Sequence, residues 1–478
     1  MSERTGDSRI LSRPARDARA ERTVADGDHS ARPEAVAADP ATTRTDLEGD
    51  TGVGSVFVSN YPAYSFWSAG ALPAFEQALD SLPRPAVPLG LYLHIPFCRK
   101  RCKFCYFRVY TDKNADQVEQ YSDALVQEQA LYAERAAIAG RAPKFVYFGG
   151  GTPSYISVKH LEDLASRLQA IVPWDEAEEV TFECEPGSLS KPKLEAIRGI
   201  GVTRLSLGIE SFDDQVLELN GRAHVSKEIY RVLPWLREVG FQQVNIDLIA
   251  GMVGETWESW RDSVQKAIDF GPETVTVYQM ELPFNTRFSK QYLEGQLEAP
   301  LADWNTKRAW HAYAFDELAK AGYEVSSAYT MVKDKESTRF MYRSSLWQGA
   351  DMMALGVSSF GHISGVHFQN TSQWDEYFEA LGAGRLAANR AFATDADQQL
   401  TREMILQLKL GEIHAEYFRA KFGVDIRERF AGAFATLGEQ GMLELVDGTV
   451  KLTRDGLLRV DSLLPEFYAP EYQHARYT

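Results

Sequence analysis

Residues Leu91–Tyr110 read LYLHIPFCRKRCKFCYFRVY, and the prediction of the fold starts from this stretch. It holds three of the four cysteines of the chain, Cys98, Cys102 and Cys105, with the spacing C-x3-C-x2-C. The apolar run Leu91–Ile95 before them is typical of a short strand. Thiolates so close in sequence converge on one centre only if the chain loops around it. Three cysteine ligands would leave one iron of a four-iron cluster open to a small molecule.

The same cysteines allow two other interpretations. Cys102 and Cys105 fit a redox dithiol, which does not need Cys98, and a zinc site would take a histidine or Cys184 as its fourth ligand. No second CxxC motif follows in the sequence. We therefore favour the iron–sulfur cluster.

Composition limits the function classes. The chain has 478 residues, enough for two or three domains, and 44% of them are apolar. Its 51 basic and 67 acidic residues give a net charge of −16, which argues against non-specific binding to nucleic acid or anionic membranes. Four cysteines, three of them clustered, do not form a disulfide framework, so a reducing cytoplasm is expected. No apolar run is long enough for a membrane-spanning helix.

The N-terminal region divides in two. Residues 1–50 contain no aromatic residue and no lysine, and their polar composition predicts a disordered tail without a secretory signal. Residues 51–90 are predicted to form an N-terminal arm, because Val56–Ser68 (VFVSNYPAYSFWS) is abruptly aromatic. The arm either packs across the catalytic domain or covers the mouth of its active site.

From Leu91 onward, short apolar runs alternate with helical periodicities, which predicts βαβ units and a parallel sheet. We place the catalytic barrel, partial or complete, at residues 91–385. The predicted strands are Leu91–Ile95, Lys144–Phe148, Val180–Cys184, Arg204–Ile209, Val244–Ile249 and Thr274–Gln279. In such a barrel the site lies at the C-terminal ends of the strands, where the polar motifs of this chain fall.

The remaining residues, 395–478, predict a small C-terminal domain. Helical segments precede two apolar runs separated by Asp447-Gly448, a strong hairpin signal. This order suggests a winged-helix-like domain. The acidic balance of the chain argues against DNA binding, and we expect the domain to pack beside the site.

The cysteine motif after a strand resembles the signature of the radical S-adenosylmethionine (SAM) enzymes. The preceding His94–Phe97 (HIPF) narrows this resemblance to the oxygen-independent coproporphyrinogen III oxidase-like (HemN-like) branch, which includes class C radical SAM methyltransferases and cyclopropanases. The resemblance extends from about Leu91 to Phe467. It implies a [4Fe–4S] cluster held by Cys98, Cys102 and Cys105, with SAM on the open iron.

The resemblance also implies two SAM molecules bound side by side, because that is the family's arrangement. The turn Gly149–Thr152 resembles the family's GGGTP motif, and Ala354–Phe360 resembles its late glycine–serine segment. The first SAM would contact Tyr92, Gly150, Glu183 and Phe360. The second would contact Phe104, Gly151, Thr152, Glu210, Arg222, Asp247 and Met280. No catalytic residue is assigned, and Tyr92 and Glu210 are the candidates.

Two positions depart from the oxidase pattern. Phe107 stands where the oxidase carries a further cysteine, and Glu210 stands where it has glutamine. Both departures favour a reaction other than porphyrinogen decarboxylation. The cations Arg99, Lys100, Arg101 and Lys103 either lie in solvent, dock an electron donor or line the propionates of a porphyrinogen.

The leading expectation is therefore methyl or methylene transfer (C-methylation or cyclopropanation) to an sp2 carbon of a specialised metabolite. The alternatives are coproporphyrinogen III dehydrogenation, with oxidative decarboxylation of propionates, and a haem chaperone without turnover. We expect a small-molecule substrate, a reductant such as flavodoxin or ferredoxin, and, for methyl transfer, a partner methyltransferase. The sequence does not name the substrate, the electron donor or the oligomeric state.

Overall fold

The computed structural model describes residues 49–473, so the predicted tail, except for its last two residues, lies outside the described residues. The main body is one twelve-stranded sheet in the order β12-β11-β10-β9-β1-β2-β3-β4-β5-β6-β8-β7. Strands β9 and β1 to β6 run parallel, and the remaining strands are antiparallel. β7 and β12 stand at opposite ends of this order, so the barrel is partial.

The parallel strands lie close to the predicted positions. They are rich in β-branched and aromatic residues, and helices cover their outer side. Their bounds are β1 Leu89–Ile95, β2 Phe145–Gly150, β3 Glu179–Cys184, β4 Arg204–Glu210, β5 Gln243–Ala250, β6 Thr274–Gln279 and β9 Asp351–Leu355. The antiparallel strands are β7 Glu324–Val325, β8 Thr330–Val332, β10 Phe360–Ile363, β11 Val366–Asn370 and β12 Ala388–Ala393.

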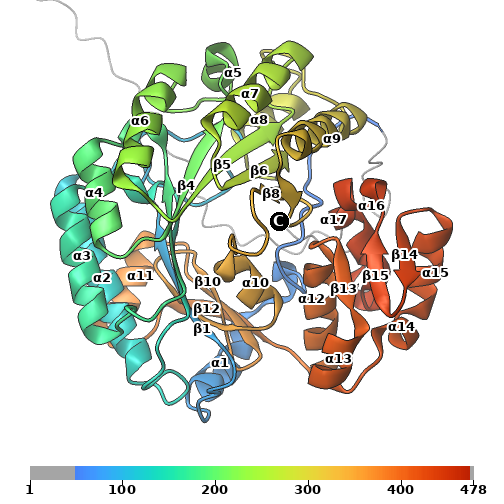
Figure 1. Ribbon diagram of the computed structural model, residues 1–478. Coiled ribbons are helices and arrows are strands. Elements are labelled where there is room, and N and C mark those ends of the chain that lie inside the picture. The colour runs from blue at the N-terminus through green and yellow to red at the C-terminus, as the bar shows by residue number, and fades with distance from the viewer. Residues whose placement is uncertain (1–48, 474–478) are drawn as a thin grey trace, which may run out of the picture. The chain divides into compact units, whose positions relative to one another are not determined.

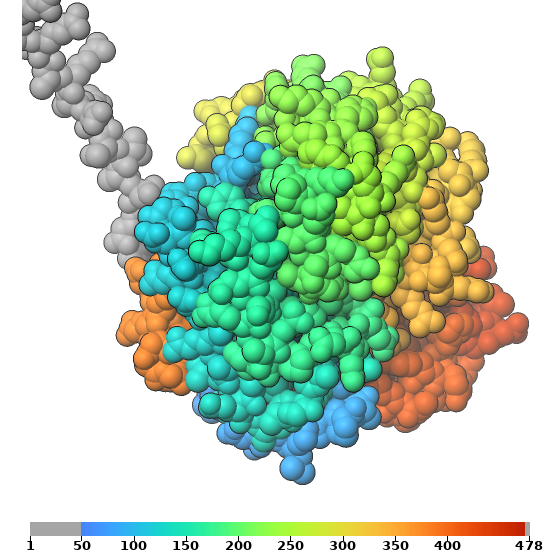
Figure 2. All heavy atoms as spheres, turned by 60° about the vertical axis from the view of Figure 1, so that its left-hand side comes forward, coloured from blue at the N-terminus to red at the C-terminus, as the bar shows by residue number. Residues whose placement is uncertain are grey.

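Helices lie on the outer, convex face of the sheet (Figure 1), and Figure 2 shows atoms of the segment from α2 to α6 at the surface of the molecule. Capping residues set several of their ends: Asn114 and Gln117 form a capping box before α2, and Gly240 and Gly271 end α6 and α7 in the left-handed conformation. The bounds are α1 Leu72–Leu79, α2 Ala115–Ala133, α3 Val158–Ile171, α4 Lys191–Gly199, α5 Asp214–Leu219, α6 Ser226–Val239, α7 Trp257–Phe270, α8 Arg287–Leu293, α9 Trp304–Lys320 and α11 Trp374–Gly382.

One helix, α10 (Met341–Trp347), lies on the concave side of the sheet (Figure 1). Glu179 at the start of β3 accepts hydrogen bonds from the backbone N–H groups of Met341 (3.0 Å) and Tyr342 (3.2 Å). A carboxylate at these free N–H groups holds a helix start in place. α10 therefore forms the floor of the barrel interior.

The C-terminal region is helical and carries a three-stranded sheet in the order β13-β15-β14. Asp447 (φ 47°) and Gly448 (φ 81°) form the predicted hairpin turn between β14 and β15. The bounds are α12 Ala396–Leu408, β13 Glu412–His414, α13 Ala415–Phe422, α14 Ile426–Arg429, α15 Ala431–Glu439, β14 Leu443–Val446, β15 Thr449–Leu452, α16 Arg454–Leu458 and α17 Val460–Leu463.

The segment from residue 49 to α1 runs between the barrel and the C-terminal region, where Figure 1 shows it in blue. At one end Gly54 N–H donates to the Leu282 carbonyl after β6, at 2.8 Å. At the other end Ser68 pairs with Ala391 of β12 through two hydrogen bonds of 3.0 Å. The arm thus spans the open side of the sheet, from the β6 side to the β12 edge.

None of the helices between residues 49 and 473 is both long and apolar enough to cross a lipid bilayer.

Candidate functional site

The three cysteines lie on one loop after β1, and backbone hydrogen bonds close this loop. Cys98 N–H donates to the Tyr110 carbonyl at 3.0 Å, and Tyr110 N–H donates to the Pro96 carbonyl at 2.7 Å. The pKa of the Cys98 thiol is raised to about 11 and that of Cys105 to about 12. Burial is the main cause, and the neighbouring Cys102 contributes to both shifts. The three thiols are therefore close enough to interact electrostatically.

Two side chains donate hydrogen bonds to these sulfurs. Thr152 Oγ1 donates to Cys98 Sγ, and Arg222 Nη1 donates to Cys102 Sγ, both at 3.3 Å. Hydrogen bonds from neutral and cationic donors favour the thiolate, which is the form that binds iron. The loop thus offers the donor set that a cluster needs, and its residues fit a [4Fe–4S] group.

Within the described part of the chain, no three or more His, Cys, Asp or Glu side chains are placed to hold a single metal ion. The thiolates of a four-iron cluster each bind a separate iron, whereas the ligands of a zinc site all bind one ion.

The glycine turn after β2 lies against the cysteine loop. Gly151 N–H and Thr152 N–H donate to the carbonyls of Ile95 and Phe97, both at 2.8 Å. A Cβ on Gly151 would lie 2.9 Å from the Ile95 carbonyl oxygen, so only glycine fits this close approach. Gly150 has a φ of 109°, and a Cβ there would meet the His94 ring at 2.6 Å.

Glu183, at the end of β3, is held beside this turn. Its carboxylate accepts hydrogen bonds from Tyr147 Oη (2.6 Å) and Gly150 N–H (3.2 Å). Burial raises the pKa of Glu183 to about 7. Tyr92 stacks on Tyr147 with 5.9 Å between ring centroids. Tyr92, Gly150 and Glu183, three of the predicted first-SAM contacts, are therefore grouped around Tyr147, which the sequence reasoning missed.

The predicted second-SAM contacts form two groups. Arg222 Nη2 lies 3.5 Å from Glu210 Oε1 and donates to the Gly208 carbonyl at 2.6 Å. Glu210 has a φ of 68°, uncommon for a residue other than glycine. Burial raises its pKa to about 7 even beside Arg222. Asp247 lies on the neighbouring strand and accepts a hydrogen bond from Ser206 Oγ at 3.0 Å.

The second group is apolar. Phe104 packs against a small cluster that contains Met280, with Leu282 and Phe288. Phe360, predicted to contact the first SAM, packs against the arm: its ring centroid lies 4.4 Å from that of Tyr64 and 5.7 Å from that of Trp67.

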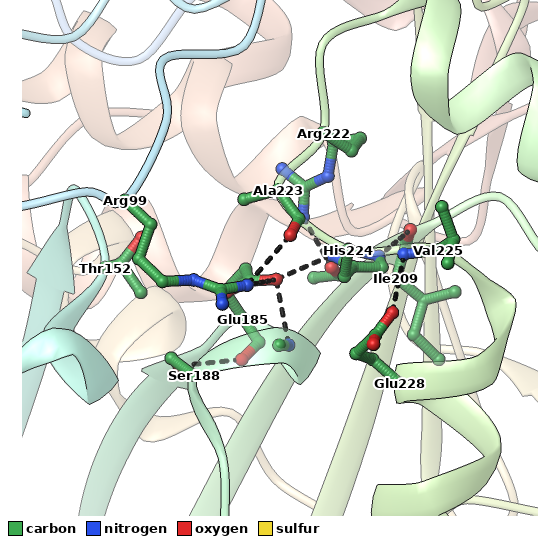
Figure 3. A network of polar contacts seen from close by, with 12 residues as sticks. Arg99, Thr152, Glu185, Ser188, Ile209, Arg222, Ala223, His224, Val225 and Glu228 are labelled. Carbon is green, nitrogen blue, oxygen red and sulfur yellow. Dashed lines mark hydrogen bonds and ion pairs between the residues drawn. The ribbon is translucent and has the colours of Figure 1, made fainter.

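Figure 3 shows a polar network behind the cysteine loop that the sequence reasoning also missed. Glu185 binds Arg99 Nη2 at 3.2 Å and His224 Nδ1 at 2.9 Å, and Arg99 Nη2 also donates to the Ala223 carbonyl at 2.8 Å. Because Arg222, Ala223 and His224 are consecutive residues, this network is joined to the hydrogen bond between Arg222 and Cys102. Glu185 thus fixes the cysteine loop to the Arg222 segment.

The four cations of the cysteine loop have different partners. Arg99 pairs with Glu185, and Lys103 pairs with Glu298 at 2.8 Å. Lys100 donates to the Arg222 carbonyl (3.3 Å), and Arg101 donates to the Cys105 carbonyl (3.1 Å). Two of these cations are therefore already neutralised by carboxylates.

The cysteine loop, the glycine turn and the partial barrel define a radical SAM protein, and comparisons with known proteins agree. Residues 92–267 match the model of the radical SAM superfamily, and residues 394–459 match that of the HemN C-terminal domain. The haem chaperone HemW of Bacillus subtilis is 26% identical over 381 residues, covering 77% of this chain and 96% of the relative. The oxygen-independent coproporphyrinogen III oxidase of Escherichia coli is 25% identical, covering 87% and 93%.

A solved structure of coproporphyrinogen III oxidase (HemN) from Escherichia coli, described as a radical SAM enzyme, has a TM-score of 0.74 at 24% identity, covering 86% of this chain and 96% of that one. The chain belongs to the HemN-like branch of the radical SAM superfamily, and it is a radical SAM enzyme with a [4Fe–4S] cluster and SAM as cofactors. The relatives are an oxidase and a chaperone, so they give the expected methyl or methylene transfer no support.

Proposed function

We propose that this chain generates a 5′-deoxyadenosyl radical and uses it to oxidise a carboxylate-bearing small molecule, in the manner of coproporphyrinogen III oxidase. The observation that carries the proposal is the convergence of the cysteine loop, the glycine turn and the buried Glu183 at the C-terminal edge of the parallel strands. The oxygen-independent coproporphyrinogen III oxidase of Escherichia coli supports this choice of reaction, because the chain aligns along 93% of its length.

In this proposal Cys98, Cys102 and Cys105 hold the cluster. When bound, the reduced cluster and SAM together supply the carbon radical that removes a substrate hydrogen atom. The protein supplies orientation and exclusion of water. Gly150 brings a backbone group close to the first SAM, and the Glu183 carboxylate accepts a hydrogen bond from its amine or ribose, with Tyr147 fixing the carboxylate.

The arm closes the site from the open side of the barrel. Tyr64 lies against Phe360, and Glu281 accepts hydrogen bonds from Ser55 and from Val56 N–H (3.0 Å). Exclusion of water matters because a carbon radical must meet substrate before it meets another hydrogen donor. We therefore assign the arm the covering role.

Methyl or methylene transfer remains the second candidate because of one feature. The buried Glu210–Arg222 pair and the apolar Phe104–Met280 contact would form a second pocket, with a carboxylate beside a sulfonium cation. In this alternative a second SAM donates the transferred carbon, and a partner methyltransferase acts in the same pathway. A haem chaperone is the third candidate, supported by the likeness to HemW.

One anaerobic assay separates the three. Cluster-loaded protein is incubated with SAM and dithionite, in one sample with coproporphyrinogen III and in a parallel sample with haem. Release of carbon dioxide together with 5′-deoxyadenosine would support the oxidase reaction. S-adenosylhomocysteine formed with 5′-deoxyadenosine would support methyl transfer. Haem binding without SAM cleavage would support the chaperone and refute the radical reaction.

Flavodoxin or ferredoxin is the proposed reductant. The four cysteines are free thiols in the structure, and a cluster held by thiolates needs reducing surroundings. The cytoplasm is therefore the proposed location.

A further inference from the structure

Two arginines meet on the floor of the barrel interior. Arg204, the first residue of β4, is only 2% exposed, and its Cζ lies 4.0 Å from the centroid of the Phe340 ring. Arg343 comes from α10, and its Cζ lies 5.8 Å from the same centroid. Both guanidinium groups therefore lie against one aromatic ring.

These guanidinium groups have few partners. The Nε atoms of Arg204 and Arg343 and the Nη1 atom of Arg343 are buried without a hydrogen-bond partner among the described residues. Arg343 Nη2 donates to Ser326 Oγ at 3.0 Å. Within residues 49–473, neither guanidinium lies within 4.0 Å of a carboxylate oxygen.

The nearby carboxylates are engaged elsewhere. Glu179 accepts hydrogen bonds from the start of α10 and from Thr181 Oγ1 (3.0 Å). Glu183 is held by Tyr147, and Asp247 by Ser206 and Asn245 Nδ2 (2.9 Å). Burial raises the pKa of Glu183 to about 7 and also raises the pKa of Asp247, while the charge of Arg204 acts against both shifts. The two cations thus lie together without a carboxylate of the described residues in direct contact with either of them.

This arrangement is costly unless an anion completes it. The ring of Phe340 offsets part of the cost through cation–π contact. Burial and the adjacent Arg204 lower the pKa of Arg343 to about 10, so Arg343 still carries its charge at neutral pH.

Space beside the pair is accessible. Tyr278 on β6 is 40% exposed, although burial raises its pKa well above the ordinary value and the carboxylates of Asp247, Glu183 and Glu210 raise it further. Tyr278 also interacts electrostatically with Arg343, so an accessible side chain lies between the acidic site residues and the arginine pair.

We propose that Arg204 and Arg343 form an anion-binding floor that holds a carboxylate group of the substrate. A guanidinium presents N–H donors in a planar fork that matches the two oxygens of a carboxylate, and two such groups give strong recognition. The floor would fix the far end of the substrate and leave its reacting carbon toward the cysteine loop. The inference rests on the proposed function for the identity of the substrate, but not for the anion site itself.

The first test is thermal unfolding of anaerobic, cluster-loaded, full-length protein in glutarate and in chloride at equal ionic strength. Saturating glutarate should raise the midpoint by about 2 °C over chloride. Arg343→Gln should lose this shift, and Arg343→Lys, which keeps the charge without the fork, should retain part of it. Arg198→Gln is the matched control, because Arg198 is a half-buried arginine on α4 that donates only to the Val202 carbonyl.

The second test uses fluorescence to measure binding of coproporphyrin III and of its tetramethyl ester. Wild type should bind coproporphyrin III at least about tenfold more tightly than the tetramethyl ester. Arg343→Gln should remove that preference without weakening the binding of the ester. Failure of coproporphyrin III to bind, with the glutarate shift present and lost in Arg343→Gln, would refute the oxidase-type function and leave the carboxylate site standing. No glutarate shift in wild type, or the same shift in Arg343→Gln, would refute the anion floor even if coproporphyrinogen III were turned over.

Discussion

Arg222 joins Cys102 to Glu210: one terminal nitrogen of its guanidinium donates to the cysteine sulfur at 3.3 Å, and the other lies 3.5 Å from the carboxylate. The Arg222 and Glu210 side chains are only 11% and 12% exposed. The same arginine therefore serves the predicted cluster loop and a buried acidic group on β4.

Removal of Arg222 should leave the Glu210 carboxylate without its cationic partner. Arg222→Met is expected to lower the free energy of unfolding by about 3 kcal/mol, because breaking one side of a buried ion pair leaves an uncompensated charge. The double variant Glu210→Gln/Arg222→Met should recover at least half of that loss. Thermal midpoints of the anaerobic proteins measure both effects, and simple addition of the two single losses would contradict the coupling.

The cluster assignment is tested by single replacements. Cys98→Ala, Cys102→Ala and Cys105→Ala should each fall well below about four iron atoms per chain and lose 5′-deoxyadenosine formation. Cys184→Ala is the control, because Cys184 is a buried thiol on β3 outside the loop. Iron content and nucleoside release report the result. Full activity in any of the three loop variants would refute the assignment of that cysteine as a cluster ligand.

Stability should fall as pH rises from about 5 to 8. Glu128 is fully buried and accepts hydrogen bonds from Gly356 N–H, Tyr377 Oη and Asn370 Nδ2, and burial raises its pKa from 4.5 to about 7. The folded chain therefore binds a proton that the unfolded chain releases between these values, so the contribution is complete below about pH 4.5 and is lost as pH rises through 7.

This single group accounts for about 3 kcal/mol at most. Glu128→Gln should flatten the dependence of the thermal midpoint on pH between 5 and 8. Glu76→Gln on α1, an exposed carboxylate, is the control and should leave the slope unchanged. An unaltered slope in Glu128→Gln would show that other carboxylates cause the dependence.

If the arm covers the site, disrupting it should partly uncouple SAM cleavage from conversion of the substrate. Tyr64→Ala removes the ring that lies on Phe360 and should raise the ratio of 5′-deoxyadenosine to substrate product by about tenfold, because buffer molecules that can donate a hydrogen atom reach the site. Phe66→Ala changes an exposed neighbour in the same segment and should leave the ratio as it is. Product analysis by mass spectrometry measures it, and equal ratios in the two variants would argue for a purely structural arm.

Much of the barrel could be predicted from the sequence because its strands are short apolar runs between amphipathic helices. β4 and β6 begin at the predicted residues, and the turn at Asp447-Gly448 has the expected geometry. β12 escaped prediction: its sequence, ANRAFA, has no strong alternation, and its place is set by pairing with β11 and the arm. It lies between the two predicted domains.

The site was predictable where a motif carried it. The cysteine and glycine motifs are contiguous, so Cys98 and Thr152 could be named before their contact was known. Tyr147, Arg204 and Arg343 were missed because each looks like an ordinary strand or helix residue. Only the fold brings α10 under the barrel and places Arg343 beside Arg204.

The open side of the sheet affects how reactants enter and leave. A complete ring of strands admits molecules only past the loops at its rim, since parting two strands would break a whole ladder of hydrogen bonds. Here residues 53–68 span the gap with single backbone pairings at Leu282 and Ala391. Displacing that segment would leave every strand of the sheet paired, but it would expose Val58, Tyr61 and Trp67, each at most 5% exposed, so buried side chains rather than a strand ladder keep this side shut.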